Sequence, residues 1–333
     1  MEVGFYVKSY NISAIDDNQR LSRYLKKVVP LLYPSMMYRY LRLKRIKVNG
    51  KKATADTHLK QGDEVRLYIP DDFFSERIPN MSFLEASDEL KIVYEDTHIA
   101  VINKAEGVLS HTGKQQDNDT LINRFLKYLY EKKEYDPYIE SSFTPALCNR
   151  LDFGTAGLVI AAKNLAALSE INLMIKNRLI KKKYLAVVTS KPPADGVYTA
   201  FHRRNDENNT VLLSDTKTSD AKKISTAIWK IYEENGLFLV QVELITGRKH
   251  QIRAHLKHLG CPILGDAVYG ETEINRKYML SHQALVAYAI SFELSGHEED
   301  YPTLSFLNNL SVKSDDIEFI LQFFNRSLLT LPD

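Results

Sequence analysis

Two short polar stretches carry residues whose types and spacing suit chemistry on a polar substrate. The first, residues 148–157, places Arg150 and Asp152 on a loop with Gly154 and Gly157, directly before a buried-type strand. The glycines permit tight turns and the close approach of a bulky ligand. Taken alone, an arginine two residues from an aspartate is more typical of a surface ion pair or of a turn-capping aspartate.

The second stretch, residues 246–255, follows a predicted strand and opens a predicted helix. His250, Arg253 and His255 resemble a set of metal ligands, but the interleaved Arg and Lys residues would repel a cation. We therefore expect no metal here. The favoured interpretation is an arginine that reaches a catalytic carboxylate.

The elements that must position both stretches are mostly strands. Apolar runs and alternation predict strands at residues 92–94, 99–102, 158–162, 184–188, 224–232 and 237–244. Amphipathic spacing predicts a helix at 120–130, opened by Asp119, and a second helix capped by Asn164. Strands outnumber helices, and many can join as hairpins. The expected fold class is therefore α+β, a largely antiparallel mixed sheet with flanking helices and not a doubly wound parallel sheet.

A basic module precedes this body. Residues 18–70 hold thirteen Lys and Arg against three acidic residues, a charge of +10, whereas the whole chain of 333 residues carries +2. Helical spacing after Leu21 and after Pro34, and alternation around Asn49-Gly50, predict a helix pair packed on a small hairpin sheet. Clustered cations of this kind bind the phosphates of a polyanion, and the alternative is a solvated, lysine-rich surface. The residues that would form one continuous basic face are Arg39, Arg42, Lys44, Arg45 and Lys47.

Composition and periodicity divide the chain into an extension (1–17), the basic module (18–70), a linker (71–88) and a body with a C-terminal extension (89–333). With 44% hydrophobic and 26% charged residues, the chain is of the globular type. It has no apolar run of eighteen residues and no export-signal pattern, so we expect neither a membrane span nor export, and a cytoplasmic protein. Cys148 and Cys261 are too few for a disulfide framework and lack zinc-ligand spacing, so we expect reduced thiols.

Three strings, in order, carry a family resemblance: NRLDFGTAGLVIAAK, KKYLAVV and LITGRKHQIRAHLKHLGCPILGDAVYG. Over residues 89–295 the chain resembles the RluA family of RNA pseudouridine synthases, and Tyr94-Glu95-Asp96, Asn103-Lys104 and residues 107–111 resemble that family's opening motif. Residues 18–70 similarly resemble the alpha-L RNA-binding motif of ribosomal small-subunit protein four. The resemblance implies isomerisation of a uridine in RNA: the bond between base and sugar breaks, the held uracil rotates, and carbon 5 is joined to carbon 1′.

The resemblance also implies roles for individual residues. Asp152 matches the catalytic carboxylate, which acts as a nucleophile or as a partner in a glycal route. Arg253 matches the residue that pairs with this carboxylate and keeps it ionised, since a nearby cation favours the charged form. Tyr184 matches the aromatic residue that stacks on the uracil and takes a proton from the reacting sugar or base.

Further residues are expected to hold the RNA. Arg150 matches the residue that fills the gap left by the flipped nucleotide, and flipping is needed because the reacting atoms are out of reach inside a helical stack. Ile252 would form part of the apolar floor, and Arg248 and His250 are expected to contact the RNA. The chain departs from the common family pattern, which leaves its substrate open, at Ala105 for Pro, Asn149 for His, Phe153-Gly154 for a basic–acidic pair, and Ala156 for Ser.

We expect RNA as the partner, with large-subunit ribosomal RNA favoured over transfer RNA. We expect no metal or organic cofactor, no membrane contact, no obligatory protein partner and a monomer. One alternative is a non-catalytic RNA-binding or ribosome-assembly protein built on an inactive synthase body, against which the intact Asp152, Tyr184 and Arg253 argue. Another is a glycoside hydrolase or base glycosylase, but a retaining hydrolase needs a paired second carboxylate, and the motif around Asp152 offers an arginine instead.

Overall fold

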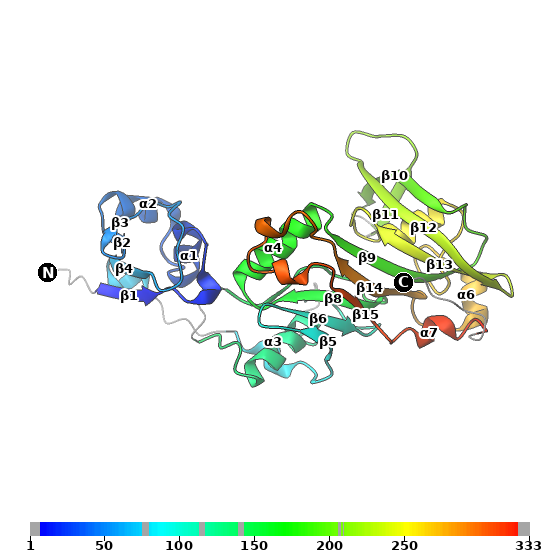
Figure 1. Ribbon diagram of the computed structural model, residues 1–333, viewed down its shortest axis with the longest axis horizontal. Coiled ribbons are helices and arrows are strands. Elements are labelled where there is room, and N and C mark those ends of the chain that lie inside the picture. The colour runs from blue at the N-terminus through cyan, green and yellow to red at the C-terminus, as the bar shows by residue number, and fades with distance from the viewer. Residues whose placement is uncertain are drawn as a thin grey trace.

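The chain folds into two separate β-sheets (Figure 1), and the buried apolar residues that pack on the first sheet form a cluster separate from those of the second. The computed structural model describes residues 7–74, 80–112, 117–138, 143–205, 208 and 210–325. In the described part, no helix is long and apolar enough to cross a membrane.

The N-terminal sheet has the strand order β1-β4-β2-β3. Its strands are β1 (Val7–Asn11), β2 (Ile46–Val48), β3 (Lys51–Lys52) and β4 (Glu64–Tyr68), and α1 (Leu21–Val28) and α2 (Pro34–Arg42) pack on it. Asn49 and Gly50 join β2 to β3 with φ values of 50° and 72°, the positive angles that a two-residue hairpin turn requires. Because β1 pairs with β4, residues Val7–Asn11 of the predicted extension also belong to this sheet.

The body sheet has eleven strands, nine of them in the order β11-β10-β12-β13-β9-β14-β8-β6-β5, with β15 beside β14 and β7 beside β8. Among the described strand pairs, only β14 and β8 run parallel, so the predicted mixed, largely antiparallel sheet is confirmed. The strands are β5 (Lys91–Glu95), β6 (Ile99–Lys104), β7 (Ala146–Leu147), β8 (Ala156–Ala162), β9 (Ile180–Val188), β10 (Gly196–Asn205), β11 (Thr210–Ser214), β12 (Lys222–Glu234), β13 (Leu237–Leu244), β14 (Leu285–Phe292) and β15 (Ser311–Lys313).

Helices flank this sheet, as predicted. They are α3 (Leu121–Glu131), α4 (Leu165–Lys176), α5 (Gln251–His258), α6 (Thr272–Tyr278) and α7 (Glu318–Leu321). Asn164 caps α4, with its side chain accepting from the Ala167 amide. The predicted cap of α3 is wrong by one residue, because Thr120 accepts from the Asn123 amide while Asp119 forms an ion pair with Arg124.

The central strands are buried on both faces. Along β6, Ala100 and Ile102 join the core that contains α3, whereas Ile99 and Val101 join the core that contains α4. This follows from the two-residue period of a strand, which sends neighbouring side chains to opposite faces. The loop that connects β7 to β8 is therefore held by a rigid base.

Candidate active site

Hydrogen bonds from the end of β6 and from the segment after it hold the loop that carries Asp152 on both sides of this residue. Ser110 Oγ donates to the Leu151 carbonyl at 2.9 Å and accepts from the Leu151 amide at 3.2 Å. The Phe153 carbonyl accepts from Lys104 Nζ at 3.2 Å and from the Gly107 amide at 2.9 Å. Hydrogen bonds thus hold the backbone immediately before and after Asp152, which fixes the position from which its side chain extends.

Lys104 is a buried cation whose ammonium group donates to three backbone carbonyls. Its side chain is 1% exposed and also donates to the carbonyls of Ala105 at 2.9 Å and Val108 at 2.8 Å. Burial lowers the pKa of Lys104 to about 8, against the attraction of Asp152. An ammonium has three donors, and three carbonyls receive them.

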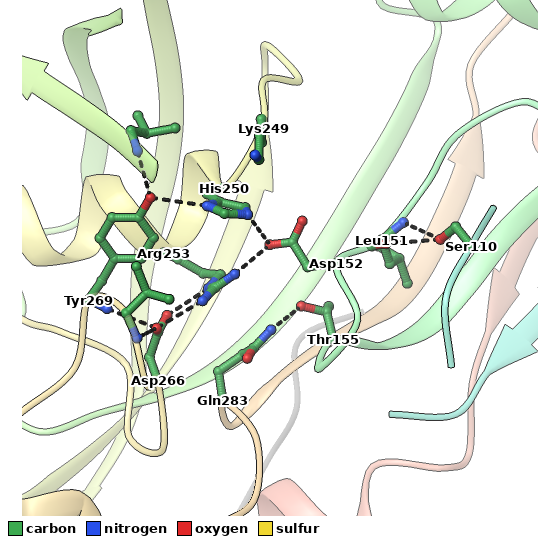
Figure 2. Close-up of polar contacts among 12 residues, drawn as sticks. Ser110, Leu151, Asp152, Thr155, Lys249, His250, Arg253, Asp266, Tyr269 and Gln283 are labelled. Carbon is green, nitrogen blue, oxygen red and sulfur yellow. Dashed lines mark hydrogen bonds and ion pairs between the residues drawn. The ribbon is translucent and has the colours of Figure 1, made fainter. Parts of the chain in front are cut away.

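Arg253 lies on the first turn of α5 and joins two carboxylates (Figure 2). Its Nη1 donates to Asp152 Oδ2 at 2.9 Å, while Nε and Nη2 donate to the two oxygens of Asp266 at 2.7 and 2.9 Å. Asp266 also accepts from the amides of Val268 and Tyr269, both at 2.9 Å. Burial opposes ionisation of Asp266, but the bonds from Arg253 outweigh it and lower the pKa of this carboxyl.

A histidine extends the same network. His250, directly before α5, has a φ of 51°, in the left-handed region that side chains rarely occupy. Its Nδ1 lies 3.0 Å from Tyr269 Oη, and its Nε2 lies 3.9 Å from Asp152 Oδ2 (Figure 2). Burial lowers the pKa of His250, although Asp152 favours its charged form. The neutral ring is therefore the main form near neutral pH.

Asp152 presents one oxygen to this network and keeps the other apart. Both Arg253 and His250 approach Oδ2, and Oδ1 has no hydrogen bond to the part of the chain that the structure describes. Figure 2 shows this second oxygen pointing away from Arg253. Arg253 thus orients the carboxylate through Oδ2, and Oδ1 is left without a hydrogen bond to the described residues.

The residues predicted for the site in the body come together around one small cavity of about 70 Å³. Tyr184, in the middle of β9, is 5% exposed, and its pKa is raised by burial and then by the charge of Asp152. A wider cavity of about 370 Å³ adjoins it and shares Asp152 and Tyr184 with it. The predicted residues that line the small cavity are Arg150, Asp152, Tyr184, Arg248, His250, Ile252 and Arg253.

Gly154 of the loop and Gly157 at the start of β8 both lie against other parts of the chain, so the close approach that they permit here is that of the chain itself. A Cβ at Gly157, whose φ is 112°, would collide with the backbone of Ala287 in the neighbouring strand β14. A Cβ at Gly154 would lie 2.7 Å from Gln283 Oε1 and 2.9 Å from His282 Cβ. Both glycines serve the packing of the loop on β14 and the residues before it.

Two of the departures from the family pattern have structural roles. Asn149 Oδ1 accepts from the Ile160 amide of β8 at 2.9 Å, which ties the start of the loop to the sheet. Phe153, about half exposed, packs edge-on against His282 with ring centroids 5.3 Å apart. These side chains therefore shape the loop as well as its surface.

Sequence reasoning missed three supporting residues: Asp266, Lys104 and Ser110. The sequence motifs assign no role to Asp266, although a buried arginine needs a buried partner as well as a partly exposed one, and that requirement is a usable signal. Lys104 and Ser110 lie in the predicted opening motif, but nothing in their spacing shows which loop they hold.

The predicted basic face belongs to the N-terminal unit and does not line these cavities. Arg39, Arg42 and Lys44 are exposed, whereas Arg45 and Lys47 are half-buried, with their charged groups 5.9 Å from the ring of Tyr40 and 5.2 Å from that of Tyr68. Within the described ranges, no three His, Cys, Asp or Glu side chains are grouped as a metal site would require.

Comparisons with known proteins identify the class. The family model described as RNA pseudouridylate synthase matches residues 98–258. An uncharacterized RNA pseudouridine synthase of Mycoplasma genitalium is 32% identical over 83% of this chain and 86% of its own. Ribosomal large subunit pseudouridine synthase C of Rickettsia conorii is 32% identical over 80% of this chain and 87% of its own.

Solved structures agree in fold. Human RNA Pseudouridylate Synthase Domain Containing 4 matches with a TM-score of 0.52 and 23% identity, over 73% of this chain and 95% of that chain. Fold and sequence together define an isomerase that acts on RNA. The chain belongs to the RluA-like family of RNA pseudouridine synthases.

Proposed function

We propose that this enzyme converts one or more uridines of bacterial large-subunit ribosomal RNA to pseudouridine, through the carboxylate of Asp152. The observation that carries the proposal is the Asp152–Arg253 pair at 2.9 Å on the wall of a cavity that Tyr184 also lines. The name of the Rickettsia conorii relative supports large-subunit RNA as the substrate, with transfer RNA as the second candidate. Ribosomal RNA is made in the bacterial cytoplasm, so we propose that compartment for the enzyme.

In this proposal Arg253 holds Oδ2 of Asp152 and leaves Oδ1 to face the flipped nucleotide. A buried guanidinium stabilises the ionised carboxylate, which is the form that either attacks carbon 1′ or assists a glycal route. Tyr184 stacks on the uracil, and Ile252 gives the pocket an apolar floor. Arg150, which is exposed and lines both cavities, fills the place of the extruded base.

We also propose that the N-terminal unit binds RNA. Its charge of +10 over residues 18–70 supports this, because clustered cations replace the counterions of a phosphate backbone. The alignment with the Mycoplasma genitalium relative covers 83% of the chain. Residues 75–333 make up a smaller share than this, so the aligned stretch also includes part of the N-terminal unit.

The test is carbodiimide primer-extension mapping on unmodified transcripts of bacterial large-subunit ribosomal RNA and of transfer RNA, each incubated with the full chain. We expect a new stop in the large-subunit transcript that is absent with Asp152→Asn. A stop only in transfer RNA would overturn the ribosomal assignment. Release of free uracil, which an isomerase retains in the chain, would instead indicate a glycosylase.

A further inference from the structure

His250 lies between the Asp152 carboxylate and a buried tyrosine, and the proposed function gives it no role. Its Nε2 lies 3.9 Å from Asp152 Oδ2, and its Nδ1 lies 3.0 Å from Tyr269 Oη. Figure 2 shows the imidazole ring between these two groups. Both ring nitrogens therefore face protein atoms, and the position of the single proton of the neutral ring decides what His250 offers to Asp152.

The hydrogen bonds of Tyr269 indicate which nitrogen carries that proton. The Val211 amide donates to Tyr269 Oη at 2.9 Å, and among the described residues His250 Nδ1 is the other hydrogen-bond partner of this oxygen. Burial raises the pKa of Tyr269, so the hydroxyl keeps its proton. If Nδ1 also donated, the hydroxyl proton would have no acceptor. The hydroxyl thus donates to Nδ1, and the proton of the ring is on Nε2.

A ring with its proton on Nε2 presents a donor to Asp152. A carboxylate oxygen can accept from two donors, and Arg253 Nη1 already donates to Oδ2 at 2.9 Å. The 3.9 Å between His250 Nε2 and the same oxygen is longer than a hydrogen bond, but contacts of this kind commonly shorten when substrate fills a site. His250 is therefore placed to be the second donor to Oδ2, which leaves Oδ1 to the nucleotide.

The backbone of His250 is held in a strained conformation. Its φ of 51° is unfavourable for a residue with a side chain, and such strain persists where the surrounding structure enforces it, most often at functional sites. Here the hairpin of β10 and β11 enforces it. His202 Nε2 donates to the Lys249 carbonyl at 3.0 Å, and the Val211 amide holds Tyr269. The hairpin thus fixes both the residue before His250 and the tyrosine beside it.

We propose that His250 is a positioning residue for Asp152: its neutral ring, with the proton on Nε2, donates to Oδ2 and, together with Arg253, fixes the direction in which Oδ1 faces the nucleotide. This inference rests on the proposed function and extends it, because it assigns the orientation of the carboxylate to two donors and not to Arg253 alone. Arg253 supplies the positive charge, and the neutral histidine adds direction without a second charge. Tyr269 orients the ring.

The experiment compares His250→Gln with His250→Asn in the full chain, on an unmodified transcript of bacterial large-subunit ribosomal RNA. The amide of glutamine extends about as far from the backbone as His Nε2 and can donate to Asp152, whereas the amide of asparagine is too short. Asparagine, however, adopts the left-handed backbone of this position more readily than glutamine does. We expect the single-turnover rate at saturating RNA to fall by no more than about threefold in His250→Gln and by at least about tenfold in His250→Asn, since one hydrogen bond to a charged group is lost.

A role in the backbone alone predicts the opposite order. If His250→Asn were the faster variant, the proposal would be overturned. The affinity for the transcript should stay within about a few-fold of that of the unmodified chain in both variants, because the effect is on the carboxylate. Weaker binding with an unchanged rate at saturating RNA would also overturn the proposal, since His250 would then contact the RNA. Melting temperatures verify that both variants are folded.

A second measurement needs no RNA. The nitrogen-15 spectrum of the histidine rings in the labelled full chain near neutral pH reports which nitrogen carries the proton, and the signals of His250 are identified by their loss in His250→Gln. We expect the proton on Nε2. A proton on Nδ1 would overturn the proposal, because Nε2 would then present a lone pair to the carboxylate.

Failure of the proposed function is distinguishable from failure of this inference. If the full chain formed pseudouridine only in transfer RNA, the ribosomal assignment would fail, and the rates of the two His250 variants would be compared on that transcript. If it formed pseudouridine in no transcript, the proposed function would fail, while the spectrum would still decide whether Nε2 faces Asp152 as a donor.

Discussion

Arg253 and Asp266 form a buried, two-point ion pair, with Nε and Nη2 donating to the two carboxylate oxygens at 2.7 and 2.9 Å. The side chain of Asp266 is fully buried and that of Arg253 is 8% exposed. The third nitrogen, Nη1, is thereby directed at Asp152. The position of the Asp152 carboxylate thus depends on a second carboxylate, Asp266, that binds the same arginine.

Asp266→Asn should therefore reduce both stability and turnover. Removing one partner of a buried pair costs about 3–5 kcal/mol, because the remaining charge loses its compensation. We expect a lower melting temperature and a single-turnover rate at saturating RNA at least tenfold lower. The matched control is Asp215→Asn, which removes an exposed partner of His258 and should change neither quantity appreciably. Turnover within twofold of the unmodified enzyme would show that Arg253 does not need this anchor.

Asp152→Asn should abolish isomerisation and leave RNA affinity within about a few-fold. The amide keeps the shape of the carboxylate but loses its charge and nucleophilicity. Pseudouridine formation and RNA binding are measured on the same transcript. Turnover above about one per cent of the unmodified enzyme would exclude Asp152 as the reacting group.

Lys104 should give the enzyme a decline in activity at alkaline pH. A lysine is charged below its pKa, and burial lowers the pKa of Lys104 to about 8, so its proton is lost as the pH rises through that value. The neutral amine cannot donate to all three carbonyls, including that of Phe153 beside Asp152. Single-turnover rates should therefore fall with an apparent pKa near 8.

The control for this decline is Lys104→Met. In this variant the rate should be low at every pH, and the fall of the rate near pH 8, the alkaline limb of the profile, should be absent. Lys91→Met, which removes an exposed lysine, should retain the limb. A limb that persists unchanged in Lys104→Met would assign it to another group.

Local chemistry predicted the parts of the fold that depend on short sequences. The Asn49-Gly50 turn and the Asn164 cap follow from the hydrogen bonds and φ angles that those residues favour, and both are present. Strand β9 begins at Ile180 and not at Tyr184, because Lys181 to Lys183 hide its alternation. Strands β10, β11 and β14 were missed; β14 pairs with β8 and β9, which lie far from it in the sequence, whereas β10 and β11 pair with each other as neighbours along the chain.

The candidate site likewise combines residues that the sequence predicts with residues that it does not. Asp152, Tyr184 and Arg253 lie in recognisable motifs, and the structure brings them to one cavity. Ser110 and Lys104 fasten the Asp152 loop across more than forty residues, a pairing that the spacing does not encode. Sequence motifs thus predicted candidate residues that the structure brings to one cavity, but not the residues that hold their loop in place.

Arg150→Ala should slow turnover more on a structured stem-loop than on a short flexible strand. Arg150 is exposed and lines both the small cavity and the wide cavity beside Asp152, so it is placed to fill a vacated stack. A flexible strand has little stacking to replace. The measurement is the single-turnover rate on both substrates, with melting temperature as the control for folding. Equal losses on the two substrates would count against this role.

The exposed cations of the N-terminal unit give the last prediction, which concerns Arg39, Arg42 and Lys44. Changing all three to Gln in the full chain should weaken RNA binding and flatten the dependence of log affinity on log salt by roughly 2 to 3, at about 0.7 to 0.9 per neutralised phosphate. The single-turnover rate at saturating RNA should stay near that of the unmodified enzyme, because these residues line neither cavity beside Asp152.

The matched control for this triple variant replaces three exposed lysines of the body, Lys133, Lys191 and Lys257, with Gln. It removes the same net charge from other elements, so it measures the effect of charge without location. A salt slope that changes equally in both triple variants would mean that the face on α2 is only a solvated surface. The N-terminal unit would then need another role, while the assignment of the body to RNA isomerisation would be unaffected.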